Sequence, residues 1–250
     1  AQVLVVPIGR GAEPVPWAQV NRGGGSGVHF FVNQTFPGDA FLADWTAAHE
    51  LAHLLLPFVR RSDAWLSEGF ASYYQNVARP RVGLLDAGTA WQKLYAGFRR
   101  GEASRPMTLR EASGEMRRRG AYMRVYWSGA AIALIADVRL RLRSGGTESL
   151  DTVLGRLADC CLPSSRRWDG PELLARLDAL GGNGIFMAEY NRWIDSRQFP
   201  DYRAAFETLG IETLGDELRY TPDQGARALR DAIMLADEPS PGESAAASPP

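Results

Sequence analysis

Two short stretches, His49-Glu50-Leu51-Ala52-His53 and Trp65-Leu66-Ser67-Glu68-Gly69-Phe70-Ala71, decide how this chain is interpreted. In the first, two histidines stand four residues apart, so on a helix their imidazoles share one face, about 5–6 Å apart. Both rings can then reach one tetrahedral metal ion, which also needs a third protein ligand and an open position for water. Glu68 is the candidate third ligand, and Glu50 is placed to act as a general base. The pattern predicts one zinc ion per chain, and a solvated Glu68 on a helix face is the alternative.

The segments around these stretches predict a mostly helical α+β fold. Residues 2–8 and 28–33 are short, rich in β-branched and aromatic residues, and bounded by Gly and Pro, which is typical of strands. A helix from about Ala40 to Leu56, ended by Pro57, carries the histidines, and one from Ser62 or Asp63 to about Ala78 carries Glu68. Further helices are predicted at 84–100, 108–118, 121–143, 148–160, 171–180, 184–195 and 200–208.

A glycine-rich stretch separates the two predicted strands. Residues 23–27 hold four glycines and one serine, which frees the backbone for a turn or for the close approach of a ligand backbone. We therefore predict that Gly24, Gly25, Ser26 and Gly27 bind extended substrate by main-chain pairing. A flexible loop is the alternative.

Composition limits the partners of the chain. Its 250 residues carry a formal net charge of -1, so no overall field attracts nucleic acid. No apolar run approaches the roughly 20 residues that a membrane-spanning helix needs. Cys160 and Cys161 are adjacent, a spacing that rarely permits a disulfide, so both are predicted to be free. Residues 238–250 are rich in Pro, Ser and Ala, which predicts a disordered tail.

The two stretches resemble the catalytic helices of gluzincin metallopeptidases, particularly the bacterial glycyl aminopeptidase family and, more distantly, the large zinc aminopeptidases. The resemblance implies a thermolysin-like catalytic domain with zinc held by His49, His53 and Glu68. It continues at Tyr126-Trp127-Ser128-Gly129-Ala130, where such families place a tyrosine whose hydroxyl faces the scissile carbonyl. Tyr126 takes that place as oxyanion stabiliser, with Tyr122 as the substitute one helical turn earlier.

The chain also departs from this family. The families place an acidic residue before the zinc helix to bind the free amine of the substrate, and the glycine-rich stretch has no carboxylate. Ser128 stands where lysine is usual in these families. His29 either has a structural role on its strand face or lines the cleft. Arg124 either binds a substrate carboxylate or is solvated at the surface. The choice between endopeptidase and aminopeptidase therefore stays open.

Together these patterns predict a zinc-dependent peptidase that acts on peptides or proteins. A catalytically inactive scaffold and a zinc hydrolase of a non-peptide amide are the alternatives. The expected divisions are a strand-rich edge (1–39), a zinc-binding helical core (40–143), a C-terminal helical lobe (144–220) and the tail. The oligomeric state is not predicted. An Ala-Gln start fits signal cleavage, which favours the periplasm or cell envelope of a bacterium.

Overall fold

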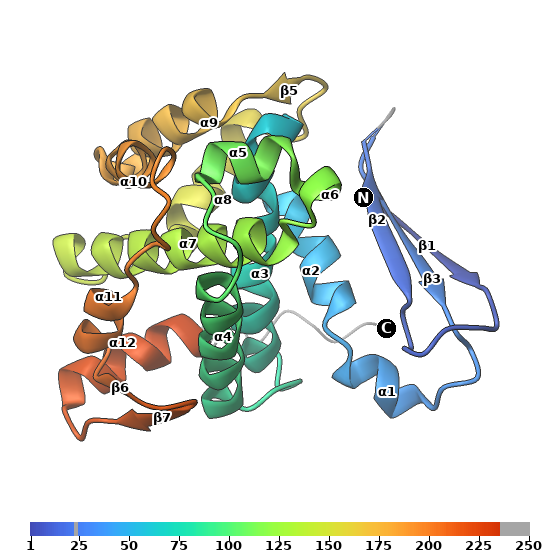
Figure 1. The fold of residues 1–250 in the computed structure, drawn as a ribbon, viewed down its shortest axis with the longest axis horizontal. Helices are drawn as coiled ribbons and strands as arrows, with labels where there is room; N and C mark the ends of the chain where they lie inside the picture. The colour runs from blue at the N-terminus through green and yellow to red at the C-terminus, as the bar shows by residue number, and fades with distance from the viewer. Residues whose placement is uncertain (23–24, 236–250) are drawn as a thin grey trace, which may run out of the picture.

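A computed structural model describes residues 1–22 and 25–235. The architecture is a helical body with a small three-stranded sheet at one side (Figure 1). The predicted α+β, mostly helical class is therefore confirmed. The glycines at 23 and 24 and the predicted tail at 238–250 lie outside the described residues.

The N-terminal sheet has the order β1-β3-β2, with β1 (Gln2–Pro7) parallel and β2 (Trp17–Asn21) antiparallel to β3 (Gly27–Val32). Val28 and Phe30 of the central strand are buried, because alternate residues of a strand point to the same face and this face packs on the loop before β2 and on helix residues. The strands predicted at 2–8 and 28–33 are present. β2, which the sequence analysis missed, lies at the edge of the sheet nearest the helical body.

The segment predicted as one helix from Ala40 to Leu56, which carries His49 and His53, is broken into two helices. α1 (Gly38–Ala43) ends at Asp44, whose backbone is extended, and α2 (Thr46–Ala52) continues as a short 3₁₀ turn, His53–Leu55. The Asp44 carboxylate accepts a hydrogen bond from the backbone N–H of Thr46 at 2.7 Å, a local turn that competes with helical continuation. The prediction of one helix from Ala40 to Leu56 was wrong for this reason.

Two long helices, α3 (Ala64–Arg81) and α7 (Tyr122–Ser144), cross at the centre of the core. Their crossing point is made by Gly69 and Gly129. A Cβ added to Gly129 would lie 2.0 Å from the carbonyl oxygen of Trp65, so only glycine lets the two backbones approach this closely. The crossing brings Glu68 and Tyr126, each next to or one turn from its glycine, to the same end of the core.

The remaining elements surround this pair. α4 (Ala87–Glu102) packs against α7, and the short α5 (Leu109–Gly114) and α6 (Met116–Arg119) lead into it. A two-residue ladder joins β4 (Phe58–Val59) to β5 (Arg167–Trp168). The rest of the chain forms the following elements: α8 (Leu150–Cys161), α9 (Gly170–Leu177), α10 (Ile185–Trp193), α11 (Arg203–Thr208), β6 (Ile211–Leu214), β7 (Glu217–Tyr220) and α12 (Gln224–Met234).

The C-terminal part differs from expectation in two respects. The β6–β7 hairpin was not predicted, because its apolar residues are few and mostly exposed. Helix α12 was not predicted either. Cys160 and Cys161 form a disulfide at the end of α8, with Cα atoms 3.7 Å apart, so the prediction of two free thiols was wrong. Adjacency disfavours such a bond but does not forbid it. The domain boundaries proposed from the sequence stay predictions.

Candidate metal centre

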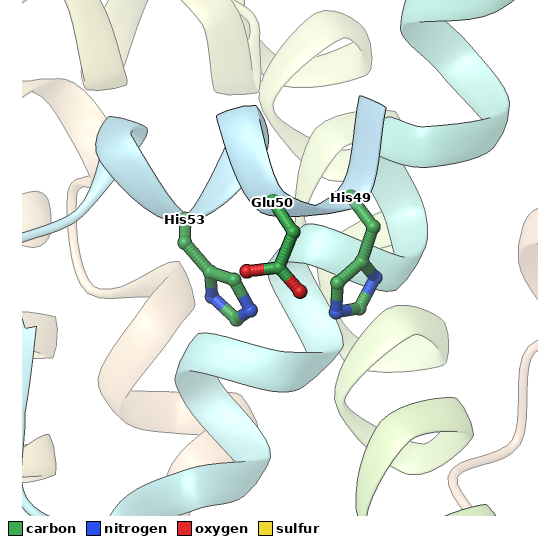
Figure 2. A group of neighbouring side chains, drawn as sticks. All are labelled: His49, Glu50 and His53. Atoms are coloured by element: carbon green, nitrogen blue, oxygen red, sulfur yellow. The ribbon is translucent and has the colours of Figure 1, made fainter. Parts of the chain in front are cut away.

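Helix α2 carries His49 and Glu50, and the 3₁₀ turn that continues it carries His53, with the carboxylate of Glu50 between the two imidazole rings (Figure 2). One ligand atom from each residue lies within 4.8 Å of those of the other two. The two rings meet edge to face with their centroids 4.9 Å apart. The four-residue spacing places the two imidazoles on one face of the helix, and Glu50, one residue after His49, lies beside that face. This His-Glu-His group could bind a metal.

Glu68 reaches the same point from α3. Its Oε2 lies 3.4 Å from Nε2 of His49 and 3.6 Å from Nε2 of His53. In a tetrahedral zinc site with bonds of about 2.0–2.2 Å, two ligand atoms stand roughly 3.4 Å apart. Both distances are close to that edge of the tetrahedron, so the Glu68 carboxylate lies where it could share a metal ion with the two histidines.

Two residues that the sequence analysis missed orient the imidazoles. Nδ1 of His49 hydrogen-bonds Oε1 of Gln75 at 2.8 Å, and Nδ1 of His53 hydrogen-bonds Oγ of Ser67 at 3.0 Å. With these bonds made by Nδ1, both Nε2 atoms turn toward Glu68, which is the orientation a metal ligand needs. Gln75 stands seven residues after Glu68, two helical turns along the same face of α3, and that spacing was the available signal.

Burial sets the protonation of the site. It lowers the pKa of His53 to about 4, so the imidazole is neutral, as a metal ligand must be. Burial also raises the pKa of Glu50, and the nearby charge of Glu68 adds to that effect. For Glu68, burial would raise the pKa, but the hydrogen bond to His49 and the interactions with His53 and Tyr126 together lower it. The two carboxylates therefore differ, with Glu50 the better proton acceptor.

Tyr126 completes the centre from α7. Its ring stacks on that of His49, with centroids 5.7 Å apart, and its hydroxyl interacts with the carboxylate of Glu68. Burial, helped by the charge of Glu68, raises the pKa of Tyr126 far above its ordinary value, so the hydroxyl keeps its proton. Tyr122 contacts the ring of Tyr126 but is 39% exposed and does not line the cavity, so the structure brings Tyr126 and not its substitute to the metal ligands.

A cavity of about 960 Å³ opens beside these residues. One wall is strand β2 with the following Arg22, the floor is α2 and the start of α3, and the remaining walls come from β4, β5, α5 and α6. Arg22 was not singled out from the sequence. It donates hydrogen bonds to the carbonyl oxygens of His53 and, at 2.7 Å, Leu56, and so ties the sheet to the end of the zinc-motif helix. The cavity is large enough for several residues of an extended peptide.

Several other candidates lie elsewhere. Gly25, Ser26 and Gly27 follow the β2 wall but do not line the cavity, and Gly24 lies outside the described residues. His29 hydrogen-bonds Asn21 across the sheet at 2.9 Å and does not line the cavity.

On α7, Arg124 is buried and donates hydrogen bonds to the carbonyl oxygens of Arg197 and Gln198, so it faces away from the site. Ser128 is fully buried, and its hydroxyl has no hydrogen-bond partner among the described residues. We have no physical account of that serine.

Comparison with known proteins supports the fold. A solved structure of an aminopeptidase N family protein from Idiomarina loihiensis superimposes with a TM-score of 0.63 at 16% sequence identity. The match covers 84% of this chain and 40% of that one, so this chain spans less than half the length of the solved protein. No protein-family model matches the sequence, and the search of curated proteins gives no match. Within the described part of the chain, no helix is long and apolar enough to cross a membrane.

Proposed function

We propose that the protein is a zinc-dependent peptidase that cleaves internal peptide bonds. The observation that carries the proposal is the position of the Glu68 carboxylate, at tetrahedral ligand spacing from both histidine Nε2 atoms. The aminopeptidase N-like fold agrees with a peptidase, although the fold alone does not fix the reaction.

Each side chain has a distinct role in this proposal. His49, His53 and Glu68 would hold the zinc ion, which when bound lowers the pKa of a water toward roughly 7 and polarises a carbonyl. Glu50, with its raised pKa, takes the proton of the attacking water and returns it to the leaving amine. The protonated hydroxyl of Tyr126 donates a hydrogen bond to the oxygen on which negative charge develops.

Strand β2 supplies a binding edge for the substrate backbone. Among the described strands it pairs with β3 alone, in the order β1-β3-β2, so its other edge is not paired within them, and residues 17–21 line the cavity. An extended peptide can add to that edge as a further strand. We assign to β2 the main-chain pairing that the sequence suggested for residues 24–27.

The carboxylates of the cavity favour an endopeptidase over an aminopeptidase. Capture of a free amino terminus needs an unpaired carboxylate near the metal. Three glutamates line the described cavity: Glu50 and Glu68 belong to the metal centre, and Glu115 is ion-paired with Arg118 and Arg119. The described walls therefore offer no carboxylate free for that task.

Cleavage of a peptide library with free and with acetylated N-termini, together with metal analysis, tests this proposal. One zinc per chain and equal cleavage of both peptide sets are expected. The Glu50→Gln variant serves as control, since it should keep zinc and lose turnover by about 10²–10⁴-fold. Cleavage confined to free N-termini would contradict the endopeptidase assignment, and no zinc or near-wild-type activity of Glu50→Gln would contradict the mechanism.

A further inference from the structure

The residues that line the cavity carry an excess of positive charge. Six arginines line it against three glutamates, although the whole chain has a net charge of -1. The lining arginines are Arg22, Arg60, Arg61, Arg117, Arg118 and Arg167. Arg22 is occupied by the backbone carbonyls of the zinc-motif helix, so the excess resides in the other five.

Four of these cations are not neutralised within the described chain. None of its ion pairs includes Arg60, Arg61, Arg117 or Arg167. Glu115, the only carboxylate on their side of the described cavity, pairs with Arg118 and Arg119 instead. All four side chains belong to exposed residues, so they can reach a ligand in the cavity.

The β4–β5 ladder positions the Arg167 side chain and the backbone of Arg60 at the cavity. The β4–β5 ladder sets Arg167 opposite Phe58, and its guanidinium lies over that ring at 4.6 Å, which limits its motion. The backbone N–H of Arg60 donates a hydrogen bond to the carbonyl oxygen of Trp168 at 2.9 Å. This bond ties the residue before the 3₁₀ turn Arg61–Asp63 to strand β5. Residues 60–61 and Arg167, far apart in sequence, are thus brought together, and Arg117 of α6 lines the same cavity.

The distance from these arginines to the metal ligands corresponds to a few residues of substrate. Arg61 precedes Glu68 by seven residues, and Arg61, Ala64 and Ser67 line the cavity along the way. Residues 61–63 form a 3₁₀ turn, with about 2 Å of rise per residue, and α3 adds about 1.5 Å per residue from Ala64, so the path is roughly 12 Å. An extended peptide covers that distance in three to four residues.

We propose that this basic wall, Arg60, Arg61, Arg117 and Arg167, binds a carboxylate of the substrate about three residues from the scissile bond. Guanidinium groups bind carboxylates through paired N–H donors, which adds direction to the attraction. The carboxylate comes from an aspartate or glutamate side chain or from the C-terminus of a short peptide. The enzyme would thus select acidic substrates; this inference rests on the proposed peptidase function.

The test compares peptides that differ only in charge at the third residue on either side of the cleaved bond, Glu against Gln. Each exposed arginine–carboxylate pair contributes up to about fivefold, so wild-type protein should prefer the Glu peptide roughly five- to thirtyfold in kcat/KM. The triple variant Arg60→Gln, Arg61→Gln, Arg117→Gln should lose most of the preference, with Arg167 alone remaining, while still cleaving the Gln peptide. Arg176→Gln, an exposed arginine of α9 outside the cavity, is the matched control and should keep it.

Two further arms complete the experiment. A Gln peptide that ends three residues after the cleaved bond, with a free or an amidated C-terminus, distinguishes the two sources of the carboxylate. Binding of Glu and Gln peptides to the Glu50→Gln variant, measured by fluorescence anisotropy at low and high salt, does not depend on turnover. If the wild-type protein cleaves no peptide but the Glu50→Gln variant still binds the Glu peptide more tightly than the Gln peptide, only the peptidase function is refuted. Equal treatment of all peptides by wild-type protein, or an unchanged preference in the triple variant, would overturn the basic-wall proposal.

Discussion

The close crossing of α3 and α7 makes Gly129→Ala an informative perturbation. The added Cβ would lie 2.0 Å from the carbonyl oxygen of Trp65 and 2.6 Å from Cα of Gly69. Both are backbone atoms, so no side chain can turn away to make room. Since an ordinary contact begins at 3.4 Å, the two helices must separate by about 1.4 Å at this point.

That separation has consequences for stability and for the site. Overpacking of a close-packed core costs about 1–3 kcal/mol, which lowers the Tm of a chain of this size by roughly 2–12 °C. Glu68 adjoins Gly69, and Tyr126 lies one helical turn from Gly129. The distance between Glu68 and Tyr126 therefore changes when the two helices move apart. A displacement of about 1 Å in a catalytic constellation lowers the rate by about 10²-fold.

Thermal unfolding, zinc content and kcat/KM on one peptide would measure these effects. Gly155→Ala is the matched control: it lies within α8, and a Cβ there meets nothing within 4 Å. This control should gain about 0.5–1 kcal/mol and keep full activity. The reasoning would be refuted if Gly129→Ala matched wild-type protein in both Tm and kcat/KM.

Four other predictions concern the centre itself. Tyr126→Phe should lower kcat by about 10²–10³-fold with zinc content unchanged, as measured by steady-state kinetics and metal analysis; unchanged kcat would remove its role. Gln75→Leu should weaken zinc binding about 10–100-fold in a competition titration with a chelator, because Nδ1 of His49 loses its partner. The acid limb of kcat/KM should lie above the ordinary glutamate pKa of 4.5, since activity falls as pH falls through the raised pKa of Glu50; a limb at or below that value contradicts its role as base. In zinc-free protein, the pKa of His53 is lowered from 6.5 to about 4, so the unfolded chain binds a proton more readily than the folded one. The free energy of unfolding should therefore fall by roughly 3 kcal/mol between pH 6.5 and 4. Urea unfolding would measure this fall, and His53→Gln should reduce it.

Local sequence patterns were sufficient to predict the elements that carry the chemistry. The strands at 2–8 and 28–33 and most helices follow from hydrophobic periodicity and from Gly and Pro, which act over a few residues. The same approach failed at Asp44, where one side-chain hydrogen bond ends a helix, and at β2, a five-residue strand defined by its pairing with β3. Cys160 and Cys161 were misjudged because a statistical preference does not decide a single pair.

By itself, the sequence determined which side chains could form the centre: on any helix, the four-residue spacing places His49 and His53 on one face, with Glu50 next to it. Only the tertiary structure decided that Glu68 and Tyr126 meet them, because that depends on two helices crossing at Gly69 and Gly129.

The partners of the centre likewise depend on contacts between distant segments. Gln75 orients His49 from another helix, Arg22 ties the sheet to the zinc-motif helix, and the basic wall joins β4 to a strand more than a hundred residues later. A helical repeat fixes neighbours three and four residues apart, whereas such contacts arise only when the core packs.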